Sequence, residues 1–167
     1  MSARSEIFSS EMKQFPLNFA FALISDIREF KAEIIKHYGE VPRIYCAPGS
    51  CNQVIMAVLR NALESLTDQG TITIKTGIEG EYLRIDISDT GRGIPEENLG
   101  RVFDPGFTTK GVQVGVGLGL AICYDIVTQR HSGRIDITSE PNKGSTVTIR
   151  IPASPPSTNG TEENGSS

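Results

Sequence analysis

The sequence predicts an α/β fold, a two-layer sandwich in which helices lie on one face of a mixed, mainly antiparallel sheet. Apolar and polar residues alternate with a period of two in four segments, which is the pattern of half-buried strands. These segments are 71–76, 82–88, 134–140 and 146–151. Apolar residues recur instead at helical spacing over 50–66 and 117–130. Paired strands separated by amphipathic helices favour two layers.

The N-terminal part predicts further elements. Apolar residues at helical spacing continue up to Gly39, so we expect a helix over 19–38. A short strand is expected over 43–46, and Ser50 is expected to cap the helix that follows it. A short helix is also expected over 96–102.

Composition divides the chain into a domain and two ends. Residues 1–13 are polar and aperiodic and predict a flexible lead-in. Residues 153–167 are rich in Pro, Ser, Thr, Asn, Gly and Glu, which cannot bury apolar area, so we expect a disordered tail. One domain is expected over 14–152, with a glycine-framed loop at about 95–114.

The overall charge and apolar content exclude several classes of partner. The net charge of −4 offers no basic surface to nucleic acid. The most apolar run, 19–24, is far too short to span a bilayer, so we expect no membrane contact. Cys46, Cys51 and Cys123 lack metal-type spacing, and we expect reduced thiols in a cytoplasmic domain.

Two glycine clusters occur in a fixed order, 89–94 after a strand and 115–120 before a helix. Glycines leave backbone N–H groups open to phosphate, and a helix N-terminus adds positive potential. Other phosphate motifs are absent from the sequence, including the P-loop and the complete dinucleotide-fold pattern. The clusters therefore suggest a nucleotide site with a mobile cover.

Asp89 continues the parity of Leu83, Ile85 and Ile87, which places its carboxylate at the end of an apolar face. A buried carboxylate needs hydrogen-bond donors. A base with an exocyclic amine, such as adenine, would supply one. Alternatively, Asp89 caps the following turn through its own backbone.

Asn61 lies in a helical stripe with Val54, Val58 and Ser65. The oxygen of an amide in an apolar stripe is a suitable ligand for Mg²⁺. A buried asparagine that bonds to backbone is the alternative.

Between the glycine clusters, the aromatic and basic residues of the loop could anchor a closing lid and meet phosphates. Alternatively, they could form a solvated surface loop.

Together these segments resemble the catalytic ATP-binding domain of bacterial sensor histidine kinases, in the superfamily of DNA gyrase, mismatch-repair ATPases and heat-shock chaperones. Asn61 with Ala62 resembles the N box, and 89–94 the first glycine box. Segment 101–110 is similar to the F box, 115–120 to the second glycine box, and 143–146 to the last. The resemblance implies the Bergerat-type ATP-binding fold, with the loop 95–114 as its lid.

The resemblance also implies roles for single residues. Asp89 would bond the adenine amine, and Asn61 would hold Mg²⁺ on the phosphates. Gly91 and Gly93 would shape the adenine end, and Thr146 would lie near it. The full implied nucleotide-binding set is Asn61, Asp89, Gly91, Gly93, Ile94, Arg101, Phe103, Lys110, Gly115, Gly117, Leu118, Gly119 and Thr146.

By the same resemblance, the chain would transfer the γ-phosphate of ATP to a histidine on a separate dimerisation and phosphoacceptor domain, in cis or in trans. A response regulator would be an indirect partner.

No phosphoacceptor helix pair is recognisable in the sequence, and His37 is expected at a helix end. Ala57 stands one turn before Asn61, where hydrolase relatives carry a water-activating Glu. A methyl group cannot act as a base, which disfavours an ATP hydrolase. A non-catalytic ATP-binding switch remains the other alternative.

Overall fold

The computed structural model describes residues 13–15, 32–42, 44–107 and 119–154. Its main sheet has five strands in the order β2-β4-β5-β7-β6. Their bounds are β2 Ala32–Tyr38, β4 Gly70–Glu79, β5 Tyr82–Asp89, β6 Arg134–Glu140 and β7 Gly144–Pro152. Strand β2 runs parallel to β4, whereas every other neighbouring pair is antiparallel. The predicted mixed, mainly antiparallel sheet is confirmed.

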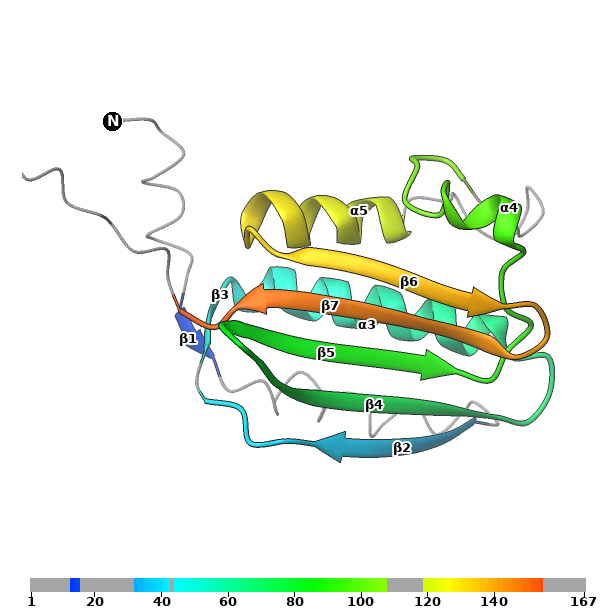
Figure 1. Ribbon diagram of the computed structural model, residues 1–167, viewed down its shortest axis with the longest axis horizontal. Helices are drawn as coiled ribbons and strands as arrows, with labels where there is room; N and C mark the ends of the chain where they lie inside the picture. Colours follow the sequence, from blue (N-terminus) through cyan, green and yellow to red (C-terminus); the bar gives the residue numbers. More distant parts are fainter. Residues whose placement is uncertain (1–12, 16–31, 43, 108–118, 155–167) are drawn as a thin grey trace, which may run out of the picture.

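The helices of the described residues cover one face of this sheet (Figure 1). They are α3 Pro48–Ser65, α4 Glu96–Leu99 and α5 Gly119–Asp125, and a π-helical turn, Ile126–Arg130, continues α5. A second, two-stranded sheet pairs β1 Lys13–Phe15 with β3 Ile44–Cys46. The two-layer arrangement is therefore as predicted. None of the helices described has both the length and the apolar character that crossing a membrane requires.

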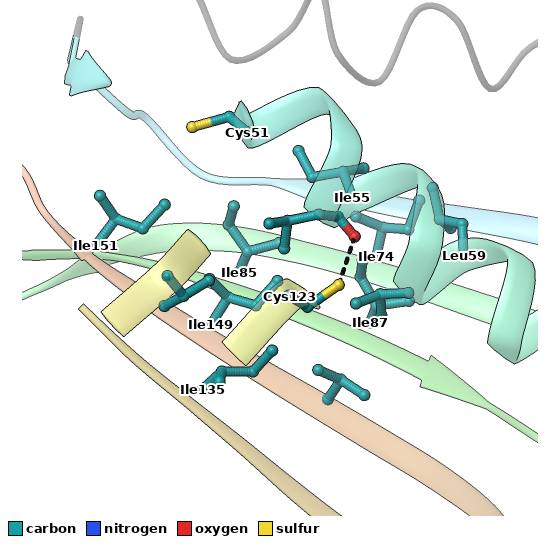
Figure 2. Packing of buried hydrophobic residues seen from close by; sticks show 14 of the residues in the cluster. Cys51, Ile55, Leu59, Ile74, Ile85, Ile87, Cys123, Ile135, Ile149 and Ile151 are labelled. Atoms are coloured by element: carbon teal, nitrogen blue, oxygen red, sulfur yellow. Dashed lines mark hydrogen bonds between the residues drawn. The ribbon is translucent and has the colours of Figure 1, made fainter. Parts of the chain in front are cut away.

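The core lies between the sheet and the pair α3 and α5 (Figure 2). Ile85 and Ile87 of the central strand β5 are almost fully buried, as are Ile55 and Leu59 of α3. The side chains of β5 alternate between buried and partly exposed along the strand, because successive residues point to opposite faces. Asp89 continues the parity of the buried residues at the end of the strand and is itself half-buried, and its carboxylate points toward the helix layer, where it bonds Ser65.

Among the described residues, the outer face of the sheet carries a network of ion pairs. Arg84 bonds Glu79 at 2.8 Å and Asp86 at 3.0 Å. Arg150 on the neighbouring strand bonds the same Glu79 at 2.6 Å and Asp136 at 3.1 Å. The network spans β4, β5, β7 and β6 and balances charge across strands whose outer side chains are partly exposed.

The expected helix over 19–38 is wrong in its described part. Residues 32–38 form β2, which pairs in parallel register with β4 from Ala32 opposite Gly70 to Tyr38 opposite Thr76. The preceding residues 16–31 lie outside the described part of the chain. His37 therefore belongs to a strand, opposite Lys75, and not to a helix end.

Three expected boundaries also shift. Helix α3 begins at Pro48, with Ala47 as its N-cap residue, so Ser50 lies within the first turn and does not cap it. Proline has no backbone N–H, but the N–H at the first helical position has no partner within the helix, so nothing is lost there. The φ angle of proline also suits a helix. Strand β4 continues through 77–79, and α4 ends at Leu99 instead of 102.

His131 joins the start of α3 to the end of the π-helical turn. Its side chain is buried, with Nδ1 3.0 Å from the carbonyl oxygen of Ile126. Its Nε2 accepts a hydrogen bond from the backbone N–H of Ala47 at 3.2 Å. A ring that donates through Nδ1 and accepts through Nε2 is neutral. Burial lowers the pKa of His131, and Arg130 lowers it further, against the opposing effect of the Ile126 bond.

We expect the stability of the fold to decrease as pH falls below about 6.5, because the unfolded chain takes up a proton at His131 more readily than the folded chain does. Between pH 7.5 and 5.5 the wild type should lose more unfolding free energy than His131→Gln does. Urea unfolding followed by circular dichroism measures this. The exposed His37 provides the control: His37→Gln should lose as much unfolding free energy between the two pH values as the wild type does. Equal losses in wild type and His131→Gln would contradict the assignment.

Candidate nucleotide-binding site

Those predicted site residues that the structure describes lie toward one end of the sheet. There, β5 and α3 both end, α5 begins, and the β6–β7 turn and α4 lie beside them (Figure 1). In the figure this is the right-hand end, opposite the small sheet of β1 and β3. Antiparallel order places the end of β5 next to the start of β7, so segments distant in sequence become neighbours.

Asp89 is the last residue of β5 and is half-buried. Its Oδ1 accepts a hydrogen bond from the backbone N–H of Gly91 at 2.8 Å and a second from the hydroxyl of Ser65, also at 2.8 Å. The bond to Gly91 is the turn cap that the sequence left open as an alternative. Among the described residues, Oδ2 has no hydrogen-bond partner. Because the cap uses only one oxygen, the other can still accept a bond from a ligand amine.

The turn after β5 packs directly on the last turn of α3. A Cβ atom at Gly91 would lie 2.1 Å from the Oγ of Ser65 and 2.7 Å from its carbonyl carbon, so no side chain fits there. The backbone N–H of Arg92 donates to the carbonyl oxygen of Ser65 at 3.1 Å. This bond satisfies one of the carbonyls that a helix end leaves without a partner.

The β6–β7 hairpin supports the same turn from its other side. Gly93 has φ of 68°, and a Cβ atom there would lie 2.0 Å from the carbonyl oxygen of Glu140. Asn142 donates its N–H to the Arg92 carbonyl at 2.7 Å. The N–H of Ile94 donates to the Oγ of Ser139 at 2.8 Å. Residues 91–94 are thus held between α3 and the hairpin.

Strand register shows where Thr146 lies relative to Asp89. Ser145 lies opposite Asp89 in the β5–β7 ladder, and Thr146 lies opposite Ser88. The hydroxyls of Thr146 and Ser88 are 2.8 Å apart, on the sheet face away from Asp89. Ser145 therefore stands beside the carboxylate, and its Oγ lies 2.9 Å from that of Ser139.

Asn61 lies on α3, one turn before Ser65, and is half-buried. Its side-chain amide makes no hydrogen bond within the described part of the chain, so the alternative of a backbone-bonded asparagine finds no support there. A Cβ atom built on Gly119, the first residue of α5, would lie 3.9 Å from the Asn61 Nδ2. Asn61 thus faces the start of α5, and its free amide oxygen suits a cation that takes most of its other ligands from phosphates and water.

The described part of the loop between the clusters is anchored by its aromatic residues. Phe103 is half-buried, packs against the core, and lies with its ring centroid 5.5 Å from that of Tyr124 on α5. The Arg101 guanidinium lies 5.0 Å from the Phe107 ring centroid and 3.7 Å from the Asp104 carboxylate. Arg101 is exposed and is held here by its own loop.

Several expected site residues cannot be placed. Lys110, Gly115, Gly117 and Leu118 lie outside the described residues. Gly119 is described and exposed at the start of α5.

Sequence reasoning missed Ser65 and Ser145 as neighbours of Asp89. Small hydroxyl residues give no periodic signal, although Ser65 had been placed on the same helical stripe as Asn61.

Residues 47–155 match the family model described as "Histidine kinase-, DNA gyrase B-, and HSP90-like ATPase". This match covers Asn61, both glycine clusters and the β6–β7 hairpin. The chain belongs to this family. Membership in an ATPase family agrees with a nucleotide site built from Asp89 and the glycine turns.

Three similar curated proteins are named as kinases. The chain is 37% identical to the sensor histidine kinase ZraS of Escherichia coli strain K12 over 67% of this chain and 23% of that protein. It is 38% identical to sporulation kinase E of Bacillus subtilis strain 168 over 68% of this chain and 15% of that protein. It is 44% identical to the sensor histidine kinase RcsC of E. coli strain K12 over 63% of this chain and 11% of that protein. The chain thus spans less than a quarter of the length of each of these three relatives.

Solved structures support the fold of this ATPase family. The catalytic domain of the histidine kinase ThkA superposes with a TM-score of 0.76 at 27% identity, covering 86% of this chain and 97% of that domain. ThkA in complex with the response regulator protein TrrA gives a TM-score of 0.71 at 26% identity, over 89% of this chain and 46% of that one. The chain therefore corresponds in extent to one domain of such a kinase.

We expect Gly91→Ala to separate α3 from the turn after β5, because its methyl group would overlap Ser65. The unfolding free energy should fall by about 1–3 kcal/mol, and nucleotide binding should weaken with it. Gly100→Ala is the matched control. A Cβ atom at Gly100 meets nothing within 4 Å, so stability should stay within about 0.5 kcal/mol. Denaturant titration of the two variants checks this, and equal stability would refute the close approach.

Proposed function

We propose that this chain binds Mg²⁺·ATP at the α3–β5 end of the sheet and transfers the γ-phosphate to a histidine on another domain, as the catalytic domain of a two-component sensor histidine kinase. The observation that carries the proposal is Asp89, whose Oδ2 is left without a partner among the described residues while Oδ1 is held by two donors. An adenine amine is a donor of the kind this oxygen lacks. The kinase relatives and the ThkA catalytic domain support this choice within the family.

Magnesium would be held by Asn61 together with the phosphates. Mg²⁺ prefers oxygen ligands and keeps several waters, so one amide oxygen from the chain suits it. Within the described residues no group of three or more acidic, histidine or cysteine side chains could hold a metal. When bound, the ion would neutralise charge on the phosphates, and Asn61 would orient it.

Arg101 and the expected lid residue Lys110 would meet the phosphates when the lid closes. Arg101 is exposed and is held only within its own loop, so its guanidinium can turn without breaking a buried contact. The glycines 115, 117 and 119 would line the phosphate chain from the start of α5. We propose 95–114 as the lid and 14–152 as the ATP-binding domain that carries it, followed by the expected tail 153–167. The expected lead-in 1–13 is one residue too long at its end, because Lys13 pairs with Cys46 in the small sheet.

The phosphate acceptor would come from a separate dimerisation domain, in cis or in trans. His131 is buried and bonded at both ring nitrogens, and His37 lies on the edge strand β2. The burial of His131 and the bonds at both of its ring nitrogens make it unsuited to receive the phosphate. A response regulator would then take the phosphate from the acceptor, and the ThkA–TrrA complex makes such a partner reasonable. All of these partners and ATP imply a cytoplasmic location.

Ala57 favours a second candidate, a non-catalytic ATP-binding switch that acts on a protein partner. This residue lies one turn before Asn61 on α3 and packs against the core. Its methyl group cannot hold or activate water, and it adds no polar support behind the metal. The same residue disfavours an ATP hydrolase.

We expect Asp89→Asn to weaken ATP binding about 10- to 100-fold, because an amide replaces the charged acceptor of the adenine amine. Isothermal titration calorimetry with Mg²⁺·ATP measures the change. Asp86→Asn is the matched control: Asp86 is on the same strand but faces outward, bonded to Arg84 and Thr148, and its removal should leave ATP affinity unchanged. If Asp89→Asn bound ATP like the wild type, the pocket assignment would be wrong.

Phosphoryl transfer distinguishes the candidate functions. We expect the chain, given γ-labelled ATP, Mg²⁺ and a separately made acceptor domain, to place acid-labile label on the acceptor. Asn61→Ala should reduce this labelling at least about 10-fold while affinity for ATP without Mg²⁺ stays near wild type. Tight ATP binding without transfer to any cognate acceptor would favour the switch. Steady phosphate release without acceptor would favour a hydrolase.

A further inference from the structure

We propose that Ser65 is a positioning residue for base recognition. Its hydroxyl holds the Asp89 carboxylate in one orientation, with Oδ1 turned toward the chain and Oδ2 left for the exocyclic amine of the nucleotide base. This inference rests on the proposed function, and it assigns the base preference of the site partly to a residue on the helix layer.

The geometry at Asp89 supports this assignment. Ser65 Oγ and the Gly91 N–H both lie 2.8 Å from Oδ1. The terminal torsion of an aspartate is soft and roughly two-fold, so the carboxylate is not oriented by its own side chain. Two donors on the same oxygen, one from the turn and one from the helix, select one orientation. Removing one of them leaves a single pivot about which the carboxylate can rotate.

Within the described residues, Ser65 is the one side chain that donates to Asp89. The strand neighbours of Asp89 are Ile72 on β4 and Ser145 on β7. Ile72 offers no donor, and the Ser145 hydroxyl lies 2.9 Å from the Ser139 hydroxyl. The sheet therefore supplies the carboxylate, and the helix supplies the side chain that orients it.

Ser65 also has a competing acceptor. Its Oγ lies 2.7 Å from the carbonyl oxygen of Ala62 on the last turn of α3. A hydroxyl carries one proton, so it donates to one of these acceptors at a time. Hydrogen bonds to an ionised carboxylate are stronger than those between neutral groups, which favours Asp89. A role confined to the helix end would affect stability and not base preference, and this difference can be measured.

The experiment uses the full 167-residue chain and two nucleotides, ATP and purine riboside triphosphate, which lacks the 6-amino group. Ser65→Ala should weaken Mg²⁺·ATP binding about 3- to 10-fold and leave binding of the purine analogue within about two-fold of wild type. The preference for ATP over the analogue should shrink by the same factor. Ser65→Cys, a weak donor of similar shape, should fall between serine and alanine.

Ser88→Ala is the matched control. It removes a hydroxyl from the residue next to Asp89, but on the outer face, where Ser88 bonds Thr146. It should leave both affinities unchanged, and thermal unfolding checks that every variant is folded. An equal loss for both nucleotides in Ser65→Ala, or no loss for ATP, would overturn the inference and leave the proposed function standing. A wild type that bound neither nucleotide would overturn both.

Discussion

The contact between the end of α3 and the turn after β5 determines the geometry of the whole candidate site. It exists because Gly91 has no side chain, since a Cβ atom there would overlap Ser65. Through this contact the Arg92 N–H reaches the Ser65 carbonyl, and the Ser65 hydroxyl reaches Asp89. The position of the carboxylate therefore depends on both layers of the sandwich. A shift of α3 over the sheet would move its donor away from its acceptor.

The β6–β7 hairpin makes the same turn rigid from the opposite side. Bonds from Asn142 to the Arg92 carbonyl and from the Ile94 N–H to Ser139 fix residues 92 and 94. The adenine end of the proposed site is consequently built on a strand end, a helix end and a hairpin, which backbone groups of the turn join through hydrogen bonds. Such preorganisation lowers the entropic cost of ordering the site on binding. Arg101, by contrast, contacts Asp104 and Phe107 of its own loop within the described part of the chain.

The sequence was sufficient to predict those elements whose apolar residues recur with a regular period. Strand β6 and the hairpin β4–β5 follow from period-two alternation, and the parity of Leu83 to Asp89 placed the carboxylate on the helix face. The motif order led to the family, which the matched residues bear out. What local pattern could not supply is pairing with distant segments. Residues 32–38 carry consecutive isoleucines that fit a helix or a strand equally well, and only the parallel register with β4 decides for a strand.

The omission of Ser145 and of Ser65 has a related cause. A one-residue offset in a strand moves a side chain to the other face, and the register of β7 against β5 is a pairing between distant segments that the sequence of β7 alone does not reveal. Ser65 matters only because Gly91 approaches it, a contact between residues 26 positions apart. Hydrogen bonds between small side chains on different elements become visible only when the layers are assembled.

Ala57 restricts what this chain can contribute to the chemical step, whereas nucleotide binding depends on other residues. It packs against the core on the same helix as Asn61. A carboxylate in its place would lie against apolar side chains and would need its own partners. The methyl group therefore fits the packing of α3 but cannot accept a proton from water. Phosphoryl transfer asks mainly for positioning and charge neutralisation, which Asp89 and Asn61 can supply without a base. Under the proposed function the nucleophile would come from a partner domain, and the docking geometry of that partner would then influence the rate of transfer.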